Sequence, residues 1–346
     1  MTKRNFTLPA FLAFVLLLAG CTGRNQPESS DRDDTSGIAE LPAKRTPEAS
    51  FHIKRYEKAL FELDKANLKA ELEAIRPGFS VFLGKGNFSQ DDISQISSFI
   101  ADENNKAAFA EVLKRFPDLK ELSTRLKKAY ENYARETGVQ FSPNTYTYIS
   151  GYDFQYPIKY ADTVMIIALD MYLGSDFEMY KKMGIPNYIS SRYTPAHIIP
   201  DCMKEIAYPH IPEKKGPYTL LDAMIEQGKL YHFVKKLSPD VPDHIVAGFS
   251  KEQLKWCSDN ESNLWQFIIE NELLYSSDSK PMSMFMVDGP FTSSFSQDSP
   301  SRTGAWLGWQ IVNAYMKKNN TPLLQMTDIE NSREILEKSG YKPRKK

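Results

Sequence analysis

The spacing of apolar residues changes twice along this chain, near Pro143 and near Gly174, and no other feature limits the possible folds as strongly. Before residue 143, apolar side chains recur every three or four positions, as at Phe109, Val112 and Phe116, which predicts amphipathic helices. Residues 143–174 are instead rich in aromatic and β-branched side chains, which favours strands. Helical spacing then returns. We therefore expect a mostly α-helical α+β fold, with helical lobes around a small antiparallel sheet.

The body of the chain, residues 51–346, contains no second polar linker, internal repeat or low-complexity tract. Its length is close to the upper limit for one hydrophobic core. We predict a single globular domain with a helical part (51–142), the sheet (143–174) and a second helical part (175–346); two domains are the alternative. Within the first part, a helix is expected to stop at Pro77-Gly78.

The first twenty residues have the three-part layout of a secretory signal peptide. Lys3 and Arg4 are basic, residues 11–18 are apolar, and two small residues follow. The apolar run is shorter than the ~20 residues that a membrane-spanning helix needs. Residues 21–50 are polar and contain almost no large apolar side chain, so we expect a flexible tether there.

Charge and cysteine content exclude some classes of function. The chain has 43 basic and 44 acidic residues, and such a balance provides no basic surface for nucleic acid. Two of the three cysteines, Cys202 and Cys257, could form a disulfide in an oxidising compartment or remain as buried thiols.

No motif for metal, nucleotide or nucleophilic chemistry is present in the sequence. HExxH, CxxC, GxSxG, the Walker loop and GxGxxG are all absent. The five histidines are also too far apart in the sequence to match a recognised pair of metal ligands. We therefore predict no catalytic residue, no metal ligand and no cofactor.

The acidic residues of the second half form the best candidate cleft. Asp201 and Glu205 are four positions apart, so they share one face of a predicted helix, and Glu226 lies on the next predicted helix. Carboxylates on neighbouring helices could act as acid and base. The alternative is an ordinary solvated face in which Lys204 neutralises its neighbours.

A second candidate contact surface lies near the C-terminus. Arg302 precedes a predicted helix that contains Trp306, Trp309 and Tyr315. If these aromatic side chains are exposed, they would form a contact for a protein or a glycan. The alternative is that they are buried in the core.

The end of the signal peptide, Leu18-Ala19-Gly20-Cys21, resembles the lipobox at which lipoprotein signal peptidase cleaves before the cysteine. This resemblance implies that Cys21 carries a diacylglycerol and that its new amine carries a third acyl chain. Thr22 follows where an aspartate would signal retention, so we expect anchoring in the outer membrane, with the body in the periplasm.

Several segments resemble the family of the gliding motility lipoprotein GldB. They are YISGYDF (148–154), LDMYLG (169–174), MIEQGKLY (224–231), Asn260-Glu261 with Trp265, GAWLGWQIV (304–312) and ILEKSGYKP (335–343). The resemblance implies a lipoprotein of the gliding and type IX secretion machinery, with no enzymatic activity. Expected partners are the membrane, other envelope lipoproteins or secretion-machinery proteins, and peptidoglycan.

That family in turn resembles gluzincin-type zinc proteases, which carry HExxH on one helix and a Glu-Gly pair on the next. In this alignment, Pro200 and Lys204 occupy the histidine positions and Asp201 the position of the general base. Gln227 replaces the third ligand, with Glu226 displaced by one. A lysine ammonium has no lone pair for a metal. The resemblance implies a pseudoenzyme whose cleft is kept as a binding surface; a peptide or peptidoglycan hydrolase and a glycan-binding module are the alternatives.

Overall fold

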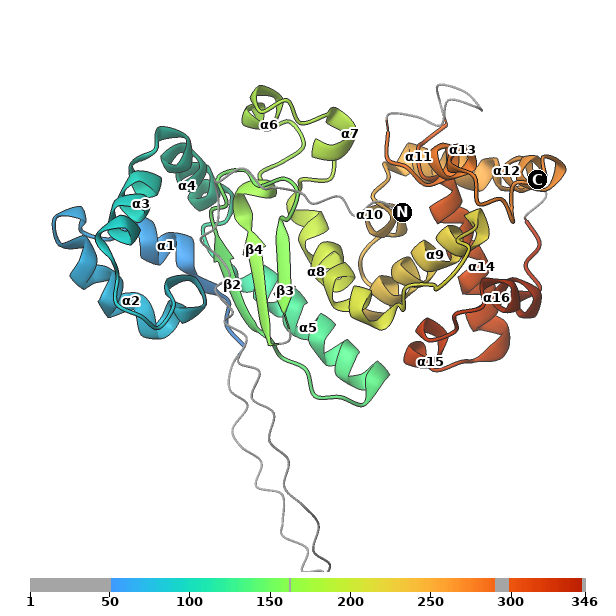
Figure 1. The fold of residues 1–346 in the computed structure, drawn as a ribbon, viewed down its shortest axis with the longest axis horizontal. Helices are drawn as coiled ribbons and strands as arrows, with labels where there is room; N and C mark the ends of the chain where they lie inside the picture. The colour runs from blue at the N-terminus through green and yellow to red at the C-terminus, as the bar shows by residue number, and fades with distance from the viewer. Residues whose placement is uncertain (1–50, 162, 290–298, 344–346) are drawn as a thin grey trace, which may run out of the picture. The chain divides into compact units, whose positions relative to one another are not determined.

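The computed structural model describes residues 51–343, apart from residue 162 and residues 290–298 (Figure 1). The predictions for the signal peptide, Cys21 and the tether fall outside the described residues. The described chain divides into two compact units. The smaller unit comprises residues 63–97, and the larger comprises residues 51–62 together with the described residues from 98 onward.

The smaller unit is helical. Its elements are η1 (Lys65–Asn67), α2 (Leu68–Leu83) and most of α3 (Gln90–Ala101). The predicted stop at Pro77-Gly78 coincides with a break in α2. Phe79, the next residue, has non-helical backbone angles (φ −133°, ψ 31°), and a second helical stretch continues from this kink to Leu83.

The larger unit contains the sheet and the remaining helices. Before the second strand come α1 (Tyr56–Phe61), α4 (Glu103–Arg115) and α5 (Lys120–Thr137). After the last strand come η2 (Leu169–Met171), α6 (Glu178–Lys182), α7 (Asn187–Ser190), η3 (Pro195–His197), α8 (Ile198–Ala207), η4 (Tyr208–His210), α9 (Leu220–Leu237), α10 (Asp243–Ala247), α11 (Lys251–Asp259), α12 (Glu261–Glu270), α13 (Ser279–Phe285), α14 (Thr303–Asn319), α15 (Leu323–Thr327) and α16 (Ser332–Ser339). None of the described helices is both long enough and apolar enough to cross a bilayer.

The sheet has four strands in the order β1-β2-β4-β3. They are β1 (Lys54–Arg55), β2 (Asn144–Tyr148), β3 (Ile158–Ala161) and β4 (Val164–Ala168). The mostly helical α+β fold with a small sheet is confirmed. The prediction that the sheet is antiparallel is wrong for two of its three pairings, since β2 runs parallel to both β1 and β4. Only β3 and β4 are antiparallel, because a short turn joins them, and this hairpin places β3 on the far side of β4 from β2.

The centre of the larger unit is the helix pair α9 and α14, which lie side by side (Figure 1). Both are buried on most faces. Their backbones touch where Gly308 meets α9, and a Cβ atom added at Gly308 would lie 1.7 Å from the carbonyl oxygen of Met224. A Cβ added at Gly228 would lie 2.4 Å from the carbonyl carbon of Gly308. Only glycine fits at either position without separating the helices.

Candidate functional site

Helix α8 carries the acidic residues that the sequence singles out, and it packs against α9 and beside β3. Both carboxylate oxygens of Asp201 are engaged. The Lys204 ammonium lies 3.0 Å from Oδ1, and the Tyr172 hydroxyl donates to Oδ2 at 3.1 Å. The side chains of Asp201 and Lys204 are 26% and 19% exposed. The structure therefore forms the ion pair that the sequence offers as the alternative to an acid–base site.

Glu205 lies one turn further along α8 and is half-buried. Burial raises the pKa of its carboxyl group, the negative charge of Asp201 raises it further, and the ammonium of Lys204 lowers it. The charge of Asp201 thus acts on Glu205, as the predicted shared face implies. Burial disfavours the charged form of the Glu205 carboxyl group.

His197 stands just before α8 and is missed by the sequence analysis. Its side chain is 5% exposed, and Nδ1 lies 2.8 Å from the Thr194 hydroxyl. Burial lowers the pKa of the imidazole to about 4, although the charge of Asp201 opposes this shift. Its Nε2 atom has no hydrogen-bond partner in the described part of the chain. The ring is therefore held neutral beside the Asp201–Lys204 pair.

The carboxylate of Asp170 anchors the sheet end of this region. It accepts hydrogen bonds from the backbone N–H groups of Ser150 (3.0 Å) and Tyr152 (2.9 Å), and from the Ser150 hydroxyl (2.8 Å). Gly151 and Tyr152 both have positive φ angles, 71° and 66°, which turn these donors toward one point. Asp170 is fully buried, and burial raises its pKa while the hydrogen bonds lower it. This clamp joins the segments 148–154 and 169–174.

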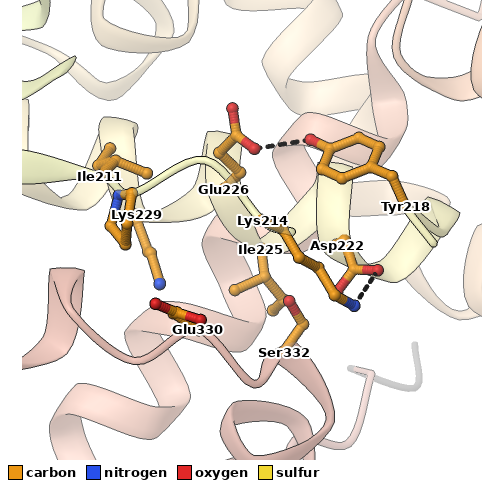
Figure 2. A pocket seen from close by; sticks show the side chains of 10 residues that line it. Ile211, Lys214, Tyr218, Asp222, Ile225, Glu226, Lys229, Glu330 and Ser332 are labelled. Carbon is orange, nitrogen blue, oxygen red and sulfur yellow. Dashed lines mark hydrogen bonds and ion pairs between the residues drawn. The ribbon is translucent and has the colours of Figure 1, made fainter. Parts of the chain in front are cut away.

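Glu226 lies on α9 and borders a pocket (Figure 2). The hydroxyl of Tyr218 donates to Glu226 Oε2 at 2.7 Å, and the Lys214 ammonium pairs with Asp222 at 2.7 Å. Gln227, the next residue on α9, is half-buried. The pocket is lined by Ile211, Pro212, Lys214, Tyr218, Asp222, Ile225, Glu226, Lys229, Glu330 and Ser332.

Lys229 forms part of the same pocket and is only 4% exposed. Its ammonium donates to the backbone carbonyl oxygens of Thr327 (3.0 Å) and Ile329 (2.6 Å). Burial lowers the pKa of Lys229 to about 8, and the charges of nearby acids, including Glu226 and Glu330, oppose the shift. The lysine therefore ties α9 to the last residue of α15 and to the segment that follows it.

Tyr208 lies near both acidic regions. Partial burial raises its pKa to about 12, and the charges of Glu205, Asp201 and Glu226 add to the shift. In the described residues, no hydrogen bond or ion pair joins Glu226 to Asp201 or Glu205. The structure thus brings the predicted acids within electrostatic range of one tyrosine but leaves Glu226 in a pocket of its own.

Comparison with known families identifies the chain. Residues 40–343 match the family model described as gliding motility protein GldB, a lipoprotein family by its name. The chain belongs to the GldB family. No curated protein and no solved structure gives a significant match. The family resemblance seen in the sequence is confirmed, and membership associates this chain with gliding motility and with a lipoprotein of the envelope, whereas the likeness to gluzincins stays a prediction.

In this GldB-family protein, Arg302 is an organising residue at the start of α14. It adopts a left-handed backbone conformation (φ 58°), and its guanidinium donates to the Tyr231 hydroxyl (3.1 Å) and the Gly248 carbonyl (3.0 Å). Its Nε atom lies 3.1 Å from the carboxylate of Asp288, which also pairs with Arg192. These contacts tie the start of α14 to three other segments.

Trp309 is 2% exposed and packs edge-on against Tyr231, with ring centroids 5.6 Å apart. Trp306 and Tyr315 are buried too. The alternative of core burial therefore holds for these aromatic residues, and an exposed contact patch there is excluded. The reason is that α14 packs against α9 and other helices around most of its circumference.

Two further predictions concern cysteine and metal chemistry. Cys202 and Cys257 are free, buried thiols, so the disulfide alternative does not hold. Within residues 51–289 and 299–343, leaving out residue 162, no three side chains of His, Cys, Asp or Glu converge in a way that could hold a metal ion.

Proposed function

We propose that this GldB-family protein supports the assembly or stability of the gliding and type IX secretion machinery through protein contacts, and not by catalysis. The observation that carries the proposal is the engagement of Asp201 by Lys204 and Tyr172. Lys204 pairs with the carboxylate that the resemblance to gluzincins places as the general base. Its ammonium has no lone pair and cannot serve as a metal ligand.

The expected partners are other envelope lipoproteins or secretion-machinery proteins, with peptidoglycan as a further contact. The half-buried face of α8 and the pocket at Glu226 provide polar groups for such contacts. Belonging to the GldB family supports this role. A partly exposed ion pair such as Asp201–Lys204 contributes little to the stability of the fold. Its two side chains can therefore contact a partner without a large loss of folding stability.

Deletion and complementation test the contact role. Loss of the gene should reduce both secreted cargo and the level of other machine components, and the wild-type gene should restore them. The double variant Asp201→Asn/Lys204→Gln should complement partially, with cargo reduced several-fold, whereas the exposed-site control Glu337→Gln should complement fully. Normal export and normal partner levels in the deletion strain would refute the proposal.

Anchoring through Cys21 is the second part of the proposal. Each buried methylene contributes about 0.8 kcal/mol, so the several acyl chains of a lipoprotein make the attachment effectively permanent. We expect Cys21→Ser to appear unprocessed or in the soluble envelope fraction, measured by fractionation and by mass spectrometry of the N-terminal peptide. Unchanged outer-membrane association of processed Cys21→Ser would contradict lipid anchoring.

A hydrolase acting on peptide or peptidoglycan is the second candidate, and the environment of Glu205 favours it. A carboxyl group with a raised pKa beside a second carboxylate, Asp201, is an arrangement that supplies an acid and a base. Glu205→Gln keeps the shape of the side chain and removes the titration. If the protein is a hydrolase, this variant should fold normally and lose function in the complementation assay; full complementation would exclude Glu205 as an acid.

A further inference from the structure

The sequence from the end of α16 onward is strongly basic, although the chain as a whole is balanced. Residues 338–346 contain five basic and no acidic residues, whereas the whole chain has 43 basic and 44 acidic residues. Lys338 and Lys342 lie in the described part of the chain and are exposed, and residues 344–346 are all basic. Like charges in one block repel each other, so this part of the chain favours an anionic counterpart.

Folding adds two lysines from α14 to this region. Lys317 and Lys318 are exposed in the last turn of α14, which packs against α16. The side-chain amide of Asn319 donates to the carbonyl oxygen of Lys338 at 3.3 Å, and a Cβ atom added at Gly340 would lie 3.0 Å from the ammonium of Lys318. The C-terminal ends of the two helices therefore meet. We call Lys317, Lys318, Lys338 and Lys342 the basic end.

Local partners account for only part of this positive charge. Lys338 pairs with Glu334 at 2.7 Å. Lys318 lies at the C-terminal end of α16, where the helix dipole favours a cation. Among the ion pairs of the described residues, none includes Lys317 or Lys342. Since α16 carries only two glutamates, the basic end keeps an excess of positive charge, and residues 344–346 add to it.

We propose that the basic end binds a membrane surface that contains anionic phospholipids. The inference rests on the proposed lipid anchoring through Cys21, which keeps the body close to a bilayer. The tether predicted for residues 21–50 has a root-mean-square reach on the order of 30 Å, so the body can turn its basic end toward the headgroups. Each lysine beside an anionic bilayer raises the membrane-bound fraction roughly fivefold, and such binding needs several charges on one surface and no pocket.

The test uses the full-length lipoprotein inserted into vesicles and a water-soluble reagent that acetylates exposed lysines, with mass spectrometry as the readout. The vesicles are phosphatidylcholine, either alone or with about one-third phosphatidylglycerol. We expect Lys317 and Lys342 to react at least about threefold more slowly in the anionic vesicles, and the difference to vanish at high salt. Lys114 and Lys255 are exposed lysines with acidic partners elsewhere in the larger unit, and their labelling should change little. Equal labelling of Lys317 and Lys342 in both kinds of vesicle would overturn the inference.

Matched variants assign the protection to the basic end. Lys317→Gln/Lys342→Gln should remove most of the protection of Lys338 in anionic vesicles, whereas the control Lys114→Gln/Lys255→Gln should retain it. All four substituted side chains are exposed, so both variants should fold normally, which circular dichroism checks. Protection of Lys338 that persists unchanged in the first variant refutes the inference.

Flotation of the same samples tests the anchoring separately. Protein that floats with both kinds of vesicle but is labelled equally in them refutes the membrane contact and leaves lipid anchoring standing. Protein that does not float with phosphatidylcholine vesicles contradicts the anchoring itself.

Discussion

Two aspartates, Asp170 and Asp201, lie in contrasting regions that Tyr172 connects. Asp170 is fully buried, and its carboxylate accepts hydrogen bonds from neutral donors of one turn, those of Ser150 and Tyr152. Asp201 is partly exposed and pairs with a lysine on its own helix. A buried carboxylate without a cation depends on the exact placement of its donors, whereas a partly exposed pair tolerates change. The first region is therefore scaffold, and the second is surface available for contacts.

Asp170→Ala should show the largest effect and tests the scaffold half of the comparison. The substitution leaves the Ser150 and Tyr152 donors buried without an acceptor, so we expect the free energy of unfolding to fall by about 3–5 kcal/mol. Urea denaturation followed by circular dichroism measures this. Asp170→Asn retains one acceptor oxygen and should lose less. A loss below about 1 kcal/mol for the alanine variant would show that the clamp is dispensable.

The neutral state of His197 predicts an intermediate, pH-dependent effect. Its pKa is about 4 in the folded protein, against an ordinary value of 6.5 for histidine, so between these values the unfolded chain binds more protons. Stability should therefore fall as pH is lowered from about 6.5 to 4, by up to about 3 kcal/mol from this group. Urea denaturation at several pH values across this range measures the free energy of unfolding. This free energy should depend less steeply on pH for His197→Gln than for the wild type. Identical slopes would contradict a buried neutral imidazole.

Lys204→Met should show the smallest effect and tests the surface half. The ion pair with Asp201 is partly exposed and three positions apart on one helix, so its removal should cost about 1 kcal/mol or less. The Tyr172 hydroxyl would still donate to Asp201. A loss above about 2 kcal/mol in urea denaturation would place this pair with the scaffold and remove the distinction between the two regions.

The sequence predicts the helices well, because their apolar spacing and caps are local. For example, α11 begins where Ser250 and Gln253 form a reciprocal cap, and α14 spans the predicted region. The sheet is harder to predict. Strand β1 has two residues and carries no alternating pattern, and parallel pairing depends on which strands become neighbours after folding.

The candidate site is predictable only where spacing determines it. Spacing places Asp201, Lys204 and Glu205 on α8, and the structure pairs the first two. The burial of a side chain and its contacts with residues distant in the chain leave no local pattern in the sequence. The sequence therefore does not single out Asp170 or His197, and it leaves Trp309 compatible with both the surface and the core. The signal that could have indicated Asp170 is the Ser-Gly-Tyr turn, whose positive φ angles collect donors around an acceptor.

The glycine contact between α9 and α14 limits how this protein can respond to a bound partner. Side chains can change rotamer and let packed surfaces slide, but at Gly228 and Gly308 there are none to move. A displacement of α9 at this contact would therefore move α14 with it, because the two backbones meet there without side chains between them.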